Sequence, residues 1–107
     1  MKNFIRVSMA VLMFALLFAT SSFAADTGAD LYKAKCASCH GASGAGDTAI
    51  GKNLKLKDLS SAEVQKQSDA ELATIIEKGK KPMPPYEGKL TKDQIQELVK
   101  YIRTLKK

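Results

Sequence analysis

The stretch Cys36-Ala37-Ser38-Cys39-His40 decides how this sequence is interpreted. Its two cysteines are separated by two residues, and a histidine follows the second directly. They are the only cysteines and the only histidine of the 107-residue chain. Four kinds of site use such a pattern: a thioredoxin-like redox pair, a zinc centre, a structural disulfide and a covalently attached haem c.

The surrounding residues weaken three of these interpretations. A thioredoxin-like pair needs a β-α-β context, and no alternating apolar run is long enough to predict a strand. Zinc needs four ligands, but Cys36, Cys39 and His40 are the only soft ligands of that kind in the domain. A disulfide is compatible with an exported protein, yet a bridge across two residues closes a very short loop and stabilises a fold little.

Haem c attachment is favoured because the chain also supplies a second axial ligand. In a C-x-x-C-H motif, the thiols of Cys36 and Cys39 bond the haem and the imidazole of His40 ligates the iron. Electron-transfer haems commonly carry methionine opposite the histidine. Met83 is the one methionine after residue 24, and it lies among all three prolines, which stiffen the backbone. The alternative role for Met83 is filling of the core.

The first 24 residues predict a secretory signal peptide. Its marks are a basic start, an apolar run and small residues before the cleavage site, here Lys2 and Arg6, residues 9–19, and Ser22 and Ala24. The alternative is a membrane anchor, but spanning a bilayer takes about 20 apolar residues. We expect cleavage after Ala24 to leave a domain of residues 25–107, periplasmic and without stable membrane insertion.

Three amphipathic patterns predict helices. The first covers about residues 27–37. The second follows a capping box at residues 68–71 and ends at Gly79, and the third follows a capping box at residues 91–94. The third carries the longest apolar stripe, which consists of Ile95, Leu98, Val99, Ile102 and Leu105.

The remaining segments predict loops. Residues 41–51 contain four glycines, and Ser60 is placed to cap a short helix within residues 58–67. The expected fold class is therefore all-α, with three main helices and loops around one covalent haem.

The composition predicts that the domain depends on its haem. All four phenylalanines and three of the four methionines lie in residues 1–24. The remaining domain is small, polar and rich in lysine, and such a domain buries a marginal core. We expect the haem-free chain to be largely unfolded, and the haem to pack against Leu54, Leu56, Leu59, Leu72, Ile75, Ile76, Leu98 and Ile102.

Three stretches resemble the class I cytochromes c, and the resemblance covers essentially the whole domain: residues 28–36, residues 76–86 and residues 98–102. It implies that Gly28 and Tyr32 pack against Leu98 and Tyr101. The chain is most similar to photosynthetic cytochromes c and to small haem domains related to oxidase subunits. Residues 51–54 lack the proline whose carbonyl accepts a hydrogen bond from the ligand histidine in many members, so another backbone carbonyl is expected there.

With His40 and Met83 on the iron, no coordination position is open for a substrate. We therefore expect a monomeric, soluble one-electron carrier and not an enzyme. The alternatives are an accessory haem subunit of a larger oxidoreductase, and a haem enzyme or sensor with a labile Met83.

Lysines near the ligand loops predict redox protein partners with acidic docking surfaces. They are Lys52, Lys55, Lys57, Lys78, Lys80, Lys81 and Lys89. The alternative is that these lysines only solvate a small domain. An exported protein with so modest a positive charge is not expected to bind nucleic acid.

Overall fold

The computed structural model describes residues 27–107, so the predicted signal peptide lies outside the described residues. This part of the chain is helical, and apart from two isolated bridges it contains no strand. The all-α prediction is confirmed. The helices are α2 (Gly28–Lys35), α3 (Ala37–His40), α4 (Ala49–Leu54), α5 (Ala62–Gln65), α6 (Asp69–Lys78) and α7 (Lys92–Thr104).

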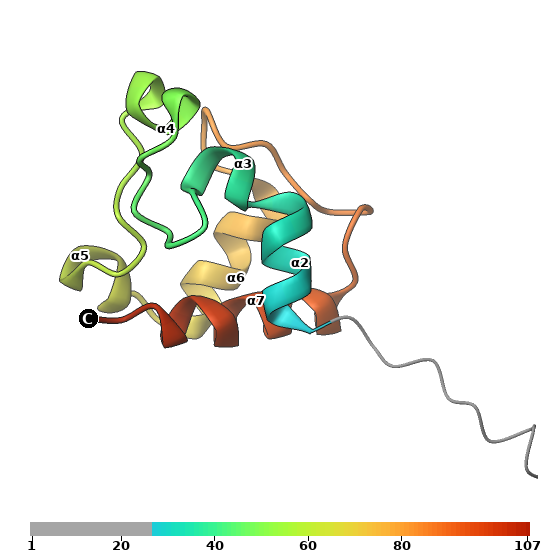
Figure 1. Ribbon diagram of the computed structural model, residues 1–107. Coiled ribbons are helices and arrows are strands. Elements are labelled where there is room, and N and C mark those ends of the chain that lie inside the picture. The colour runs from blue at the N-terminus through green and yellow to red at the C-terminus, as the bar shows by residue number, and fades with distance from the viewer. Residues whose placement is uncertain (1–26) are drawn as a thin grey trace, which may run out of the picture.

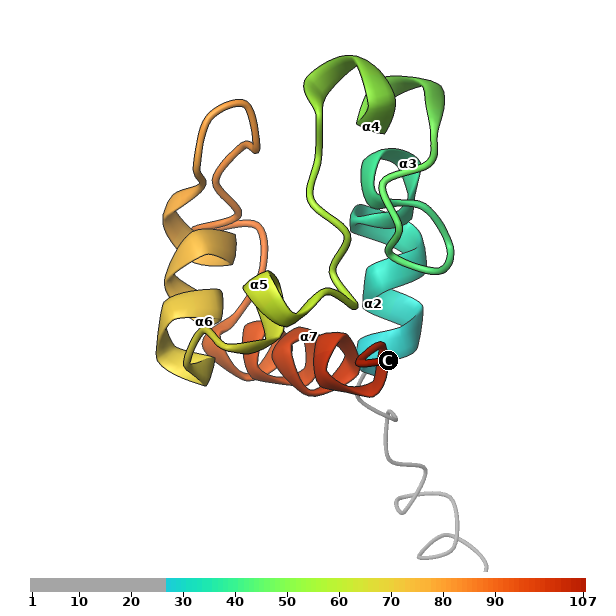
Figure 2. The same cartoon turned by 90° about the vertical axis from the view of Figure 1, so that its left-hand side faces the viewer.

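Helix α7 forms the base of the domain, and two walls stand on it (Figures 1 and 2). One wall consists of α2, α3 and α4. The other consists of α6 and the segment 79–90 that follows it. Figure 2 shows the segment 55–61 running down between the walls to α5. The fold therefore brings two distant parts of the chain to face each other.

The ends of the long helices follow the predicted capping boxes. The Ser68 side chain accepts a hydrogen bond from the Glu71 N–H, and the Glu71 carboxylate accepts one from the Ser68 N–H. Thr91 and Gln94 make the same reciprocal pair at the start of α7. These bonds satisfy backbone N–H groups that have no partner within the helix.

Three boundaries differ from the prediction. The first helix stops at Lys35, because the chain bends at Cys36 before α3 begins. Helix α4 begins inside the predicted loop, since the Thr48 hydroxyl accepts the Gly51 N–H at 2.9 Å and caps it. Ser61, rather than Ser60, caps α5. Ser60 is occupied elsewhere, as its N–H and hydroxyl both donate to the Asp58 carboxylate.

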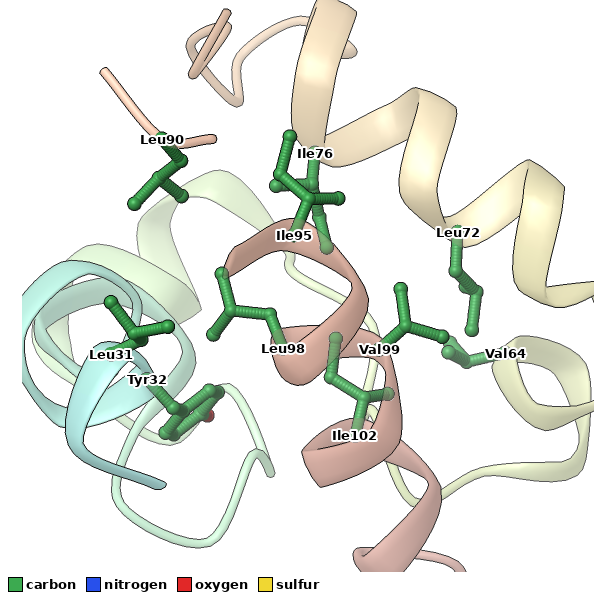
Figure 3. Close-up of a cluster of buried hydrophobic side chains, with 10 residues drawn as sticks. All are labelled: Leu31, Tyr32, Val64, Leu72, Ile76, Leu90, Ile95, Leu98, Val99 and Ile102. Carbon is green, nitrogen blue, oxygen red and sulfur yellow. The ribbon is translucent and has the colours of Figure 1, made fainter. Parts of the chain in front are cut away.

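The hydrophobic core lies where α2 and α6 meet α7 (Figure 3). Helix α7 contributes four buried residues, among which Leu98 is completely inaccessible to solvent. The buried set is Leu31, Tyr32, Val64, Leu72, Ile76, Leu90, Ile95, Leu98, Val99 and Ile102. The stripe predicted for the last helix thus forms the centre of the core, apart from Leu105, which is half-buried.

Helices α2 and α7 cross at very close range beside Gly28. A Cβ atom at this position would overlap the carbonyl oxygen of Glu97 and lie 3.0 Å from the Cβ of Tyr101. The ring of Tyr32 packs on that of Tyr101, with centroids 5.0 Å apart. The predicted contact between these helices is confirmed, and the backbone of Glu97 is its closest point.

Arg103 ties the end of α7 to the connection between α5 and α6, a role that the sequence did not reveal. Its guanidinium donates to the Asp69 carboxylate at 2.9 Å and to the Gln65 carbonyl at 2.8 Å. It also donates to the carbonyl of Gln67. No helix within residues 27–107 is long and apolar enough to cross a bilayer.

Candidate functional site

An apolar cleft of about 320 Å³ separates the two walls and reaches the base helix. This volume falls in the range of small-molecule and cofactor sites. A smaller hollow adjoins it, and the two share Cys36, His40, Leu54, Leu56, Pro82 and Met83. We refer to both hollows together as the cleft.

All four predicted site residues line the cleft. Cys36, His40 and Met83 border both hollows, and Cys39 borders the smaller one. Cys36 and His40 belong to the wall that contains α2 and α3. Met83 belongs to the opposite wall, which is far away in sequence. The fold therefore places a histidine and a methionine around one apolar space, next to the two cysteines.

The apolar residues expected around a haem also line the cleft, with one exception. Leu54, Leu56, Leu59, Leu72, Ile75, Ile76 and Ile102 all border the larger hollow. Leu98 does not, so that prediction was wrong. The stripe of α7 is wide enough to serve two surfaces, and Leu98 faces the core against α2 while Ile102 reaches the cleft.

The backbone around the C-x-x-C-H motif is held by three hydrogen bonds. The Thr48 hydroxyl donates to the carbonyl of Cys39 at 2.7 Å, and the Gly46 N–H donates to that of His40 at 2.8 Å. The buried Tyr32 hydroxyl donates to the next carbonyl, that of Gly41, at 2.6 Å. With three consecutive carbonyls occupied, the motif is a fixed part of its wall.

Gly51 allows this arrangement because it leaves no side chain between α4 and the motif. A Cβ atom at Gly51 would lie 2.5 Å from the Gly46 carbonyl oxygen and 2.7 Å from that of Cys39. The glycine-rich pattern of residues 41–51 predicted a loop at this position. Thr48, three residues earlier, could have indicated that Gly51 lies in a helix, because threonine is a common helix N-cap.

The Cys36 thiol lacks the low pKa that a thioredoxin-like redox pair uses. Cys36 and Cys39 form no disulfide in the described part of the chain. Burial, together with the nearby Cys39, raises the pKa of the Cys36 thiol to about 11. Cys36 is therefore a protonated thiol at neutral pH, whereas a thioredoxin-like pair needs a lowered pKa.

A zinc centre also finds no support. No group of three or more histidine, cysteine or carboxylate side chains is placed to hold a metal ion in residues 27–107. Structural zinc sites need four such ligands in tetrahedral geometry.

His40 has the protonation state of a metal ligand. Burial lowers the pKa of its imidazole, so the ring is neutral at pH 7, which is the form that donates an electron pair to a metal. Its buried Nδ1 atom has no hydrogen-bond partner among residues 27–107. The backbone carbonyl expected to accept from this ring is not in place. This is unusual, because most buried polar atoms in proteins are hydrogen-bonded.

Met83 lies in a tight, well-anchored turn. Its N–H donates to the Lys80 carbonyl at 2.8 Å, and its carbonyl accepts from the Lys80 N–H at 3.1 Å. Gly79 lies directly beneath this turn with a positive φ of 76°. A Cβ atom there would come within 2.8 Å of the Met83 carbonyl oxygen, so the turn and the end of α6 need glycine.

Tyr86 connects the two walls. Its N–H donates to the carbonyl of Ile76 on α6 at 3.1 Å. Its hydroxyl donates to the carbonyl of Lys35 at 3.0 Å, at the end of α2 and next to Cys36. One residue thus links the segment that carries Met83 to the backbone next to the cysteine motif, and it also borders the cleft.

These residues fit a covalent haem. The cleft is apolar, and it is bordered by two thiols, a neutral imidazole and a thioether. These are the attachment and axial groups that haem c proteins use.

Comparison with known proteins agrees with this geometry. Residues 23–102 match the family model of subunit III of cbb3-type cytochrome c oxidase. The chain is 33% identical to cytochrome c6 of Nostoc sp., a comparison that covers 94% of this chain and 90% of the relative. It belongs to the class I cytochrome c family. As a member of this family, the chain carries one covalent haem c and transfers electrons.

Two further relatives support the assignment. Cytochrome c6 of Leptolyngbya boryana is 37% identical over 78 residues, which is 73% of this chain and 88% of the relative. Among solved structures, the KustC0563 c-type cytochrome superposes with a TM-score of 0.71 at 34% identity. That comparison covers 77% of this chain and all of the other.

Proposed function

We propose that His40 and Met83 are the axial ligands of the haem iron, and that Cys36 and Cys39 bond the haem through thioethers. The observation that carries this proposal is the position of His40 and Met83 around one apolar cleft that the two cysteines also border. When bound, the haem supplies an iron that alternates between the ferrous and ferric states. The protein is then an outer-sphere carrier of single electrons and not a catalyst.

Each residue has a distinct part in this function. The neutral imidazole of His40 is available to the iron without loss of a proton. The Met83 thioether favours the ferrous state and so raises the reduction potential. The leucines and isoleucines of the cleft exclude water. The hydrogen bonds of Tyr32, Thr48 and Tyr86 hold the ligand-bearing segments, which favours fast electron transfer because little has to move.

We expect Met83→Ala to abolish the Met-to-iron ligation while leaving haem attachment intact. The near-infrared band of methionine-ligated ferric haem should disappear. The ferrous–ferric equilibrium should shift by more than about tenfold toward the ferric form, which is 59 mV for one electron. Optical spectra of the oxidised and reduced protein and a redox titration measure both effects. Extraction under denaturing conditions shows whether the haem is covalent.

Glu87→Gln is the control, because Glu87 is an exposed residue of the same segment. It should keep the band and the potential. A near-infrared band that persists in Met83→Ala would refute Met83 as the ligand, and a high-spin wild-type protein would favour a haem enzyme or sensor.

The mass of the same purified protein tests export. Removal of residues 1–24 predicts a mature chain that begins at Ala25.

We further propose that the carrier is a periplasmic monomer and docks on acidic surfaces of its redox partners. The support for docking is that five lysines, and no carboxylate, border the cleft: Lys35, Lys55, Lys57, Lys80 and Lys81. Of the lysines predicted for this role, Lys52, Lys78 and Lys89 do not border it. Attraction between this rim and an acidic partner should speed encounter at low salt. The second-order rate of electron transfer is expected to fall at least about tenfold between 10 mM and 200 mM ionic strength. A rate that is independent of ionic strength would refute steering by these lysines.

A second function follows from the family match, because that family model describes an oxidase subunit. The alternative is therefore a haem subunit held within a larger oxidoreductase. Gel filtration of native extracts distinguishes the two. A carrier elutes at the size of the mature monomer, whereas a subunit elutes with its complex.

A further inference from the structure

Arg103, near the end of α7, lies at the centre of a polar network. Its guanidinium donates to the Gln65 carbonyl at 2.8 Å, to the Gln65 side-chain oxygen at 3.3 Å and to the Gln67 carbonyl. It also pairs with the Asp69 carboxylate at 2.9 Å. These acceptors lie at the end of α5, in the link that follows it and at the first residue of α6. The connection between the two helices is therefore wrapped around one planar cation.

Gln65 extends this network to two further segments. Its side-chain amide donates to the Leu59 carbonyl at 2.8 Å and to the Ile102 carbonyl at 3.0 Å. Leu59 belongs to the segment 55–61 that runs down between the walls, and Ile102 belongs to α7 (Figure 2). One amide therefore joins the middle segment to the base helix. Arg103 fixes the orientation of that amide, because it binds the amide oxygen.

The network and the cleft meet at three residues. Leu59, Gln67 and Ile102 each present a carbonyl to the network, and each also borders the larger hollow. Neither Arg103 nor Gln65 borders either hollow. The two residues therefore hold this part of the lining from outside, through backbone atoms, while Leu59 and Ile102 remain part of its apolar border.

We propose that Arg103 and Gln65 are positioning residues that keep this part of the cleft closed to water and so help to set the reduction potential. This inference rests on the haem attachment proposed above. The hydrophobic shell of a metal centre controls solvent access and the local dielectric, and with them the potential. Without the amide of Gln65, the Leu59 carbonyl would lose its hydrogen-bond partner, which favours a movement of this segment that admits water. Water beside the haem would then favour the ferric form, because that form carries the larger positive charge.

Two variants that leave the net charge unchanged test this proposal in the haem-loaded protein. Gln65→Met keeps the length of the side chain but removes the amide. Arg103→Lys keeps the charge but replaces the planar fork, which binds several acceptors at once, by a single ammonium. In both variants we expect the ferrous–ferric equilibrium to shift at least about threefold toward the ferric form, which is about 28 mV for one electron.

The fraction of the haem that is exposed to solvent provides a second measurement. Solvent perturbation of the absorption spectrum should show a larger exposed fraction in both variants than in the wild-type protein. This measurement does not depend on electron transfer. A role in stability alone would lower the melting temperature but leave the exposed fraction and the potential unchanged.

Gln96→Met is the matched control. Gln96 is exposed on α7 and does not border the cleft. The substitution makes the same chemical change as Gln65→Met, but at a position outside the network. It should leave the potential and the exposed fraction of the haem at their wild-type values.

The outcomes separate this proposal from the proposed function. If the wild-type protein holds covalent haem with a normal near-infrared band, but both network variants behave like the control, the positioning role alone is refuted. A shift in only one of the two variants would also refute it, because the two residues are proposed to act as one network. A wild-type protein without covalent haem would refute both proposals.

Discussion

Haem-free protein is expected to show no cooperative thermal unfolding above room temperature. The cleft of about 320 Å³ is lined mainly by apolar residues of both walls and the base. Without haem its apolar lining faces water, which at about 25 cal/mol per Å² of apolar surface costs on the order of 5 kcal/mol. This is comparable with the whole free energy of unfolding of a small domain, roughly 5–15 kcal/mol. The helices therefore lack enough remaining stability to stay together.

The double variant Cys36→Ala/Cys39→Ala, prepared without haem, provides the material for this test. Circular dichroism should show most of the helical signal lost, and a thermal scan should show no sigmoidal transition. The wild-type chain prepared without haem attachment is the control, and it should behave in the same way. The haem-loaded wild-type protein should melt cooperatively. A cooperative melt of either haem-free chain above room temperature would contradict the prediction.

Gly28→Val is expected to destabilise the haem-loaded protein by about 3 kcal/mol or more. The new Cβ would overlap the carbonyl oxygen of Glu97, which is backbone and cannot rotate away. Helices α2 and α7 would have to separate, and the packing of Tyr32 on Tyr101 would loosen. For a domain of this size, the melting temperature should fall by more than about 10 °C.

Ala29→Val is the matched control, since Ala29 is the exposed neighbour of Gly28 on the same helix. It introduces the same β-branched side chain and should cost less than about 1 kcal/mol through helix propensity alone. The two melting temperatures are compared on haem-loaded protein. Equal values for both variants would show that the helices do not depend on close approach at Gly28.

Local chemistry in the sequence was sufficient to predict much of the fold. The capping boxes at Ser68 and Thr91 predicted the starts of α6 and α7, because both partners of each box lie within four residues. Ser60 was wrongly chosen as a cap, since the neighbouring Ser61 is of the same chemical type. Only the contact of Ser60 with Asp58 in the folded chain distinguishes them.

The apolar stripe of α7 shows where periodicity ceases to be informative. The period places Leu98 and Ile102 on one face of the helix, and it predicted that both would pack on the haem. In the fold this face meets two surfaces. Leu98 is buried in the core near α2, whereas Ile102 borders the cleft. The neighbour that each residue meets depends on how α2 and α7 cross. Gly28 permits that crossing through its contact with Glu97, which is far away in sequence.

Local sequence was enough to propose the chemistry of this protein, because the C-x-x-C-H motif carries the two proposed attachment groups and one proposed ligand within five consecutive residues. Met83 and the lack of any other methionine after residue 24 added the candidate for the second ligand. Only the packing of distant segments brought these groups to the border of one cleft. It placed Met83 and His40 around one apolar space, tied the two walls through Tyr86, and brought five lysines to the border of the cleft. The reason is physical: bonding capacity belongs to a residue type, but separation and environment arise only when distant segments pack together.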